Sequence, residues 1–326
     1  MTARPLPAPD GLVIGFAHAA YRLAERFALR SSGLAAVEAR TGAELDRWIG
    51  DVDVLVVSGL WRNDLIPAAR RLCFVQSISA GTDQYDRAQF RANGIRLASA
   101  QGANENAVAQ HAMALILALA RKLPQARDNQ TARVWRAMIS EIAAREDELG
   151  GKTLVIVGMG RIGARLAQLA KAFEMRVVGV RRDPSAGRGA ADRVVADTEL
   201  HQALGEADYV ALTCPLTPQT ERLIDARALA AMPRHAVLIN VARGRVVDQP
   251  ALIAALEAGT IAGAAIDCAV EEPLPPSSPL WTAPNLLITP HTAGETRRYE
   301  DHVIDLLLEN LARLRRGESG LKNEIV

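Results

Sequence analysis

The sequence predicts an α/β protein of two doubly wound domains, each a parallel sheet covered by helices. Short apolar runs rich in β-branched residues alternate with segments of helical composition along most of the chain, and this alternation is typical of parallel sheets. The length of 326 residues is enough for roughly two domains. A glycine-rich turn follows one apolar run, and it predicts which domain binds a nucleotide.

Five apolar runs predict the strands of the first domain: 12–16, 35–38, 52–57, 74–78 and 95–98. The segments predicted to be helical between them are 19–29, 43–49 and 87–93. A single long helix is predicted next, over residues 104–123, and Pro124 is expected to stop it. At about 20 residues it would measure roughly 30 Å, enough to run from one domain into the other.

Residues 154–183 predict a strand, a glycine turn, a helix and a second strand. Gly158 permits a tight turn, Gly160 leaves room for a pyrophosphate beside the backbone, and Gly163 lets the helix pack closely. The phosphates would lie at the helix N-terminus, where unpaired N–H groups favour anions. The unit therefore predicts dinucleotide binding; the alternative is a loop of an unrelated α/β protein.

The remaining strands are predicted at 209–212, 237–241, 264–266 and 286–289, with helices at 225–232 and 249–258. A last helical run, 295–315, is expected to pack back on the first domain. The predicted boundaries are therefore a discontinuous substrate domain, residues 1–100 plus 292–326, and a dinucleotide-binding domain, residues 101–291.

Composition excludes several classes of partner. The chain has 38 basic and 37 acidic residues and a formal net charge of +1, which gives no indication of nucleic acid or an anionic membrane. Its three cysteines are far apart and predict neither a disulfide framework nor a metal site. The polar, proline-rich start does not resemble a signal peptide. A cytoplasmic protein without a membrane partner is expected.

Polar residues follow the predicted strands of the second domain. Arg243 follows one strand, Asp267 the next, with Glu272 five residues later, and His291 follows the last. In doubly wound sheets, ligands bind at the carboxyl ends of the strands. These side chains are therefore expected at the same edge as the glycine turn.

Several motifs in order carry a resemblance to a known family: GKTLVIVGMGRIG, PLTPQT, INVARGRVVD, DCAVEEPL and TPHTAG. With them the chain resembles the D-isomer-specific 2-hydroxyacid dehydrogenases over about residues 100–295, and more weakly through SAGTD. The resemblance implies a flavodoxin-like substrate domain, a Rossmann domain and a homodimer. It also implies hydride transfer between NAD(P)(H) and a small 2-keto or 2-hydroxy acid, of the glyoxylate or hydroxypyruvate type.

The resemblance also implies roles for single residues. Arg243 would bind the substrate carboxylate and carbonyl oxygen, because guanidinium donors form a planar fork. His291 would be the proton donor, oriented by Glu272, which raises its pKa. Asp267 would contact the nicotinamide carboxamide. Backbone N–H groups for the substrate carboxylate are expected from Ser79, Ala80 and Gly81.

The expected cofactor-binding residues are Gly158, Met159, Gly160, Arg161, Ile162, Arg181, Arg182, Cys214, Pro215, Thr220, Val241, Ala242, Asp267 and His291. No metal is expected. Glu271 is adjacent to Glu272 and is the alternative partner for the histidine. The other histidines, among them His111, are interpreted as structural, and Trp135 as a packing or dimer contact. Cys268 and Ala269 form a smaller pair than the Val-Phe that is frequent in the family, which leaves the shape of the substrate pocket open.

The end of the second strand of the glycine unit favours NADP(H) over NAD(H). Arg181 and Arg182 stand where an acid would otherwise bind the ribose hydroxyls, and arginine suits a 2′-phosphate. The alternative is that Asp183 reaches the ribose and NAD(H) is used. Two other functions stay open: a dinucleotide-sensing binding protein or corepressor, and a formate or phosphite dehydrogenase. Formate enzymes have glutamine where Glu272 stands, which argues against that relative.

Overall fold

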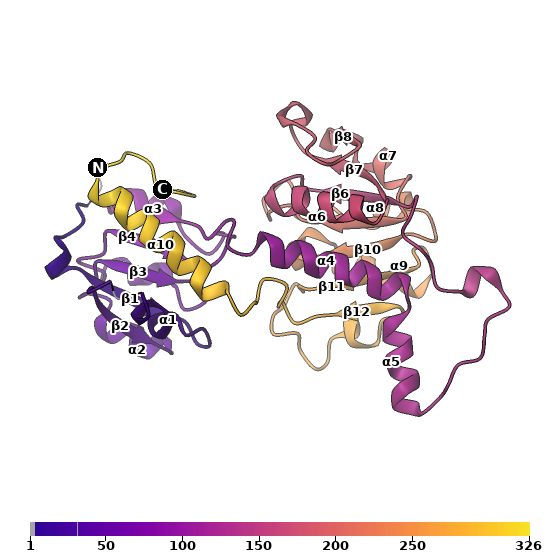
Figure 1. The fold of residues 1–326 in the computed structure, drawn as a ribbon, viewed down its shortest axis with the longest axis horizontal. Coiled ribbons are helices and arrows are strands. Elements are labelled where there is room, and N and C mark those ends of the chain that lie inside the picture. The colour runs from indigo at the N-terminus through magenta and orange to yellow at the C-terminus, as the bar shows by residue number, and fades with distance from the viewer. Residues whose placement is uncertain (1–3, 31) are drawn as a thin grey trace. The chain divides into compact units, whose positions relative to one another are not determined.

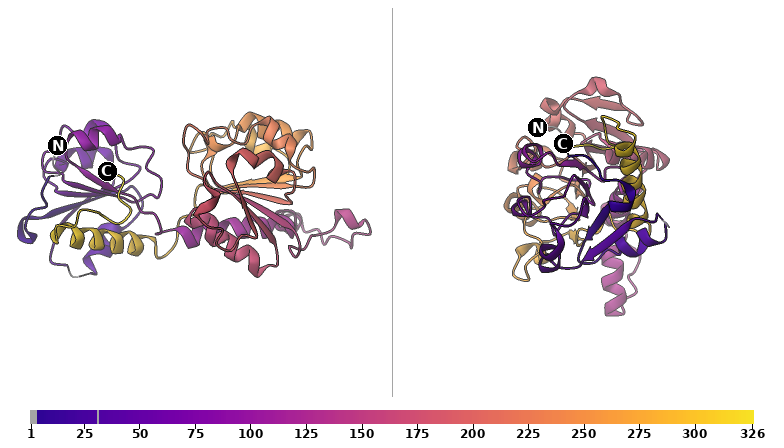
Figure 2. Two further views of the ribbon diagram at one scale, coloured as in Figure 1. Left: turned by 90° about the horizontal axis from the view of Figure 1, so that it is seen from above. Right: turned by 90° about the vertical axis from the view of Figure 1, so that its left-hand side faces the viewer.

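The computed structural model describes residues 4–30 and 32–326 and divides into two compact units (Figure 1). Unit 1 comprises Met1–Asn104 and Glu295–Val326, and unit 2 comprises Glu105–Gly294. Each unit is a parallel sheet with helices on both faces (Figure 2). The predicted α/β class with two doubly wound domains is confirmed.

Unit 1 has a five-stranded sheet in the order β2-β1-β3-β4-β5, which is the flavodoxin-like order. Its strands are β1 Val13–Ala17, β2 Ala35–Ala39, β3 Val54–Val57, β4 Phe74–Ser77 and β5 Arg96–Ala98, all paired in parallel. Its helices are α1 Leu23–Ala28, α2 Gly42–Trp48, α3 Arg87–Ala92 and α10 Tyr299–Arg315. Strands β3 and β4 are buried throughout. Strand β3 is an unbroken apolar run, as a strand covered on both faces requires, whereas β4 also buries Gln76 and Ser77.

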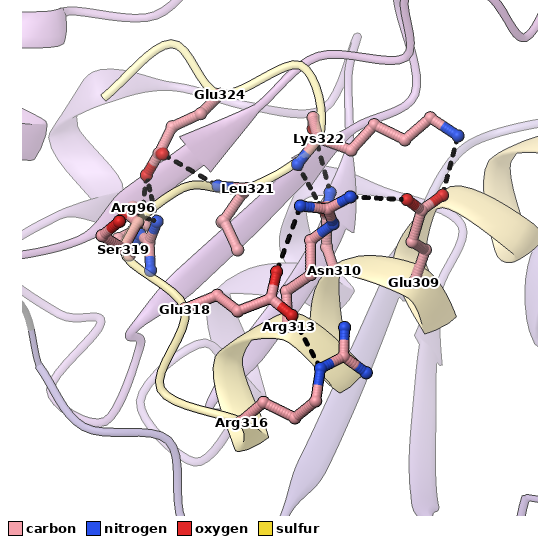
Figure 3. A network of polar contacts seen from close by, with 10 residues as sticks. All are labelled: Arg96, Glu309, Asn310, Arg313, Arg316, Glu318, Ser319, Leu321, Lys322 and Glu324. Carbon is pink, nitrogen blue, oxygen red and sulfur yellow. Dashed lines mark hydrogen bonds and ion pairs between the residues drawn. The ribbon is translucent and has the colours of Figure 1, made fainter.

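The C-terminal segment completes unit 1. Helix α10 buries Val303, Ile304 and Leu307 in the core that β1 and β3 share. Beyond α10 the chain pairs with the free edge of β5, where Ala98 and Glu324 form an antiparallel bridge. Figure 3 shows the polar contacts that hold this segment.

Unit 2 has a seven-stranded parallel sheet in the order β12-β11-β10-β9-β6-β7-β8. Its strands are β6 Thr153–Val157, β7 Arg176–Val180, β8 Arg193–Val195, β9 Tyr209–Leu212, β10 Val237–Asn240, β11 Gly263–Ile266 and β12 Leu286–Ile288. Its helices are α4 Glu105–Ala120, α5 Leu123–Ala132, α6 Arg161–Ala172, α7 Leu200–Leu204, α8 Ala226–Ala231 and α9 Gln249–Glu257. The strand order reverses between β6 and β9, the switch point at which such sheets bind nucleotides.

Alternate residues of β6 separate the two cores of unit 2. Leu154 and Ile156 pack toward α4 and α6, whereas Val155 and Val157 pack toward α7, α8 and α9. All five residues of β6 are buried. A strand with apolar residues on both faces is what a sheet covered on both sides requires.

The helix predicted over residues 104–123 is observed as α4, but it ends at Ala120 and not at Pro124. The chain leaves α4 at Ala120 and begins α5 at Leu123, with Lys122 between them in a left-handed conformation of φ 50°. Pro124 lies in the first turn of α5, where a helix needs no N–H donor. Pro124 therefore lies at the start of a second helix. This helix was not predicted because its sequence is polar and has no apolar periodicity.

Candidate active site

Two glycines of the turn after β6 are required by backbone contacts. A Cβ on Gly158 would lie 2.5 Å from the Cys214 nitrogen, and φ at Gly158 is +107°. A Cβ on Gly163 would lie 2.3 Å from the carbonyl oxygen of Gly158. Side chains at these positions would push the turn, α6 and the residues after β9 apart.

Gly160 differs from those two glycines because a Cβ there would meet nothing within 4 Å. It is the N-cap of α6, a helix of 12 residues whose first N–H groups have no partners within the helix. The space and the donors fit the pyrophosphate of a dinucleotide. The predicted neighbours Met159, Arg161 and Ile162 are part of the same turn and first helical residues.

The loop after β9 is held against the glycine turn. Thr213 Oγ1 donates to the Gly158 carbonyl oxygen at 2.7 Å. Thr220 Oγ1 donates to the Pro215 carbonyl oxygen at 2.6 Å and accepts from the Thr217 N–H at 2.8 Å. Cys214 is buried, and burial raises the pKa of its thiol to about 11. The structure thus brings these predicted cofactor-binding residues to one end of β6 and β9.

The end of β7 carries an exposed cationic turn. Arg181 Nη1 donates to the carbonyl oxygen of Gly187 at 3.2 Å, and Arg182 is exposed. The Asp183 carboxylate accepts from the N–H and the hydroxyl of Ser185, at 2.9 and 2.6 Å, and these bonds lower its pKa. The Asp183 carboxylate is therefore bonded within the turn that follows β7. Arg181 and Arg182 give this turn its positive charge.

His291 and Glu272 form the central pair of the site. His291 Nδ1 lies 2.7 Å from Glu272 Oε2, and the other carboxylate oxygen, Oε1, accepts from the Ala269 N–H at 2.9 Å. The His291 side chain is 45% exposed and that of Glu272 38%. Since the carboxylate accepts at Nδ1, the Nε2 atom of His291 remains for a substrate.

Each member of this pair shifts the pKa of the other. The hydrogen bond that His291 donates to Glu272 raises the pKa of His291, and burial acts in the opposite direction. Burial alone would raise the pKa of Glu272, but the hydrogen bonds from His291 and the Ala269 N–H outweigh burial and lower it. The arrangement favours a protonated imidazole beside an ionised carboxylate.

Arg243 is presented by a turn that follows β10. Asn240 shapes this turn, because its side chain donates to the Arg243 carbonyl oxygen and accepts from the Ala242 N–H, both at 3.0 Å. A Cβ on Gly244 would lie 2.0 Å from the carbonyl carbon of Ala269. That close approach lets the turn contact the loop of Glu272, and the Arg243 charge lowers the pKa values of Glu272 and His291.

Asp267 is buried and surrounded by donors. Its Oδ1 atom accepts from Thr289 Oγ1 at 2.6 Å and from the Thr292 N–H at 3.0 Å. Its Oδ2 atom accepts from the Ala293 N–H at 2.9 Å. The carboxylate predicted to contact nicotinamide therefore also holds both sides of His291.

The predicted carboxylate-binding residues lie after β4 in unit 1. The Ser79 N–H already donates to Ser77 Oγ at 3.1 Å, so this group is not available as the prediction requires. No such bond involves the N–H groups of Ala80 and Gly81 in the described residues. Ser79 Oγ shares a hydrogen bond of 2.5 Å with Ser58 Oγ. Two of the three predicted N–H donors remain.

Sequence reasoning missed three residues that shape the site: Asn240, Thr289 and His111. Asn240 ends a strand that is otherwise apolar, and this position could have indicated a turn-forming role. His111 lies on α4, far from the site in sequence, and its Nε2 atom is 3.0 Å from Thr289 Oγ1. The described residues contain no group of three or more histidine, cysteine or acidic side chains that could bind a metal.

Comparison with known proteins identifies relatives of both units. Residues 113–293 match the family model for the D-isomer specific 2-hydroxyacid dehydrogenase NAD binding domain. The glyoxylate reductase of Korarchaeum cryptofilum is 34% identical over 78% of this chain and 76% of its own. The glyoxylate/hydroxypyruvate reductase B of Yersinia pestis is 37% identical over 76% of both chains.

A solved structure is similar over nearly the whole chain. It is the NADPH-dependent glyoxylate/hydroxypyruvate reductase of Sinorhizobium meliloti in complex with NADP and malonate. The TM-score is 0.80 at 27% identity, and the similarity covers 97% of each chain.

Proposed function

This chain belongs to the D-isomer specific 2-hydroxyacid dehydrogenase family, and we propose that it reduces a small 2-keto acid with NADPH to the D-2-hydroxy acid. The proposed substrates are of the glyoxylate and hydroxypyruvate class. Relatives at 34 and 37% identity are named as reductases of these acids. The observation that carries the proposal is the His291–Glu272 pair at 2.7 Å, in the same unit as the glycine turn of the nucleotide-binding sheet.

Three side chains of unit 2 have different roles in the proposed reaction. A bound nicotinamide cofactor supplies the hydride that reaches C2 of the keto acid. Arg243 binds the substrate carboxylate and carbonyl oxygen through its fork of donors. His291 transfers its Nε2 proton to that oxygen, so that a hydroxyl forms. Glu272 accepts from Nδ1 throughout, which keeps the ring oriented and stabilises its protonated form.

The substrate-binding role is assigned to residues 1–100 and 292–326, which lie mostly in unit 1. The dinucleotide-binding role is assigned to residues 101–291, which lie mostly in unit 2. In unit 1, Ala80 and Gly81 are proposed to donate backbone N–H groups to the substrate carboxylate. The hydroxyl pair of Ser58 and Ser79 supports the turn that presents them.

NADP(H) is proposed as the preferred cofactor, and NAD(H) is the alternative. Arg181 and Arg182 lie at the end of β7, and Arg188 is exposed in the same turn. Asp183 is engaged by Ser185. A charge-assisted hydrogen bond to a phosphate contributes about 1.5–3 kcal/mol, which is roughly a 10- to 150-fold preference.

A homodimer is proposed on the evidence of an exposed apolar segment that follows α5. Trp135 is 98% exposed and Met138 99%, and Val134 and Ile142 are also exposed. Four large apolar side chains are thus exposed within one segment, and clustered exposed apolar groups are typical of protein interaction sites. A second copy of the chain is the partner that the family resemblance implies.

The absence of a nucleic-acid partner and the cytoplasmic location stay predictions. Among the described residues, no helix has both the length and the apolar character needed to cross a membrane.

The proposal is tested by measuring NADPH and NADH oxidation against a panel of 2-keto acids that includes glyoxylate and hydroxypyruvate. We expect turnover with at least one of them and a higher kcat/KM for NADPH than for NADH. A clear preference for NADH would contradict the cofactor assignment. Tight cofactor binding without turnover of any keto acid would instead support a dinucleotide sensor.

A further inference from the structure

His111, on α4, lies against the residues that shape the loop of His291. Its Nε2 atom is 3.0 Å from Thr289 Oγ1 and 3.5 Å from Asp267 Oδ1. The side chain is 24% exposed and that of Asp267 only 3%. His111 is thus part of a polar network inside unit 2. None of the three network residues transfers a proton in the proposed reaction.

The chemistry of the donors fixes the direction of the hydrogen bonds. Asp267 accepts backbone N–H groups on both oxygens, from Thr292 and Ala293. Thr289 donates its one hydroxyl proton to Asp267 Oδ1 at 2.6 Å. Thr289 Oγ1 therefore has no proton left for His111, so it accepts a hydrogen bond from the protonated Nε2 of His111.

The network holds the backbone on both sides of His291. Thr289 precedes His291, and Thr292 and Ala293 follow it directly. Between these fixed points, His291 has a φ of 55°, in the left-handed region that residues other than glycine rarely adopt. The surrounding contacts must maintain this conformation, because the residue itself does not favour it.

We propose that His111 is a positioning residue for proton transfer, holding the loop of His291 in register with Glu272 through Thr289 and Asp267. This inference rests on the proposed reductase function, in which His291 is the proton donor. His111 does not contact the substrate in this proposal. It connects α4 to a loop at the carboxyl end of β12, and so fixes the orientation of the imidazole.

The charged groups that face His291 within unit 2 are Glu272, Arg243 and Asp267. The hydrogen bond that His291 donates to Glu272 depends on the orientation of the ring, whereas the effects of the Arg243 and Asp267 charges depend on distance alone. Loosening the loop therefore weakens chiefly the contact that favours the protonated imidazole. The midpoint of His291 titration should fall when His111 or Thr289 loses its hydrogen-bonding atoms.

The first experiment follows His291 directly and does not depend on turnover. The chain has six histidines, so the pH titration of each imidazole can be resolved by NMR in protein with labelled histidine. The variants are His111→Phe and Thr289→Val, with His201→Phe on the exposed surface of α7 as the matched control. We expect the His291 midpoint to fall in the first two variants and to stay at the wild-type value in His201→Phe.

The second experiment is a double-mutant cycle in 2-keto acid reduction. Misplacing a reacting group by about 1 Å can cost 10²-fold, and we expect kcat to fall about tenfold in each single variant with little change in substrate KM. Because both residues act in one chain of hydrogen bonds, the double variant should lose about tenfold and not about a hundredfold.

Some results would overturn the inference. An unchanged His291 midpoint in Thr289→Val, which keeps the shape of the side chain, would show that the network does not position the imidazole. Losses that multiply in the double variant would show that the two residues act separately. A wild-type enzyme that reduces no keto acid would contradict the proposed function, while the NMR titration would still decide the role of His111.

Discussion

At the scale of single residues, the proposed site depends on an imidazole whose two nitrogens have different roles. Glu272 accepts from Nδ1 at 2.7 Å, and in the proposed reaction Nε2 donates its proton to the substrate oxygen. The carboxylate also raises the pKa of His291. The stabilisation that this pair gives to the protonated ring is present below the unfolded pKa of histidine and is lost as pH rises through the folded pKa.

Replacing Glu272 with glutamine should move the alkaline limb of keto-acid reduction to lower pH. Reduction needs the protonated imidazole, and an uncharged amide stabilises it less than a carboxylate does. The loss in kcat at high pH should stay within the about 10²- to 10⁴-fold that a proton-transfer group contributes. The measurement is the pH profile of kcat/KM.

Glu271→Gln is the matched control for that profile, because Glu271 is adjacent and exposed. Its pH profile should coincide with that of the wild-type enzyme. If Glu271→Gln shifted the alkaline limb of the profile and Glu272→Gln did not, the assignment of Glu272 would be wrong and Glu271 would be the carboxylate that partners His291.

At the scale of elements, the turn from β6 into α6 contains glycines with different physical requirements. A Cβ at Gly163 would lie 2.3 Å from a backbone oxygen, whereas one at Gly160 would meet nothing within 4 Å. The first glycine is needed by the fold. The second leaves an open space beside the helix N-terminus, where the proposed cofactor would bind.

The variants Gly163→Ala and Gly160→Ala should therefore fail in different ways. Gly163→Ala should lower the free energy of unfolding by about 1–3 kcal/mol, as overpacking does, and this is measured as a lower Tm. Gly160→Ala should keep the wild-type Tm but weaken NADPH binding, measured as a higher Kd by fluorescence titration. Equal NADPH affinities in Gly160→Ala and wild type would mean that the cofactor does not approach this residue.

The C-terminal segment depends on one buried amide of α10. Asn310 donates to Gln76 Oε1 at 3.0 Å. It also donates to the Lys322 carbonyl oxygen at 3.2 Å and accepts from the Lys322 N–H at 2.8 Å (Figure 3). Nearby, Lys322 Nζ and Glu309 form an ion pair of 2.7 Å between half-exposed side chains. The two contacts differ in burial, and so in their expected contribution to stability.

Replacing Asn310 with leucine should destabilise the fold by about 2 kcal/mol or more, because each buried group left without a partner costs about 1–3 kcal/mol. Lys322→Ala, which removes only the exposed ion pair, should cost about 0–1 kcal/mol. Thermal unfolding of the two variants beside wild type measures the difference. Similar Tm values for both would show that the buried amide is not what holds the segment.

At the scale of the whole molecule, the proposed dimer depends on the exposed segment after α5. Changing both Trp135 and Met138 to serine removes its two most exposed apolar side chains. Truncating an interface hot spot costs about 2 kcal/mol, so each change should weaken association about thirtyfold. Size-exclusion chromatography with light scattering should show a monomer at micromolar concentration.

Trp281→Ser is the matched control for the dimer, because Trp281 is 54% exposed and lies outside that segment. It should keep the wild-type mass. A wild-type chain that is already monomeric would contradict the homodimer proposal and leave the apolar segment for another partner.

Local sequence was sufficient to predict most strands and the family. Buried parallel strands are short runs of apolar residues, so β3, β6 and β9 can be recognised without any knowledge of their neighbours. The elements that it missed have weak local signals. Strand β8 is three residues long at a sheet edge, α7 is a five-residue helix, and α5 is polar with Pro124 at its start.

The sequence by itself determined which side chains could perform the chemistry, since Arg243, Glu272 and His291 follow strands whose carboxyl ends share one edge. Only the tertiary structure decided how they are held. His111 is far from Asp267 and Thr289 along the chain, and no local pattern distinguishes it from a structural histidine. The reason is physical: a strand is specified by the apolar character of consecutive residues, whereas a hydrogen bond across the fold depends on the packing of α4 against the sheet.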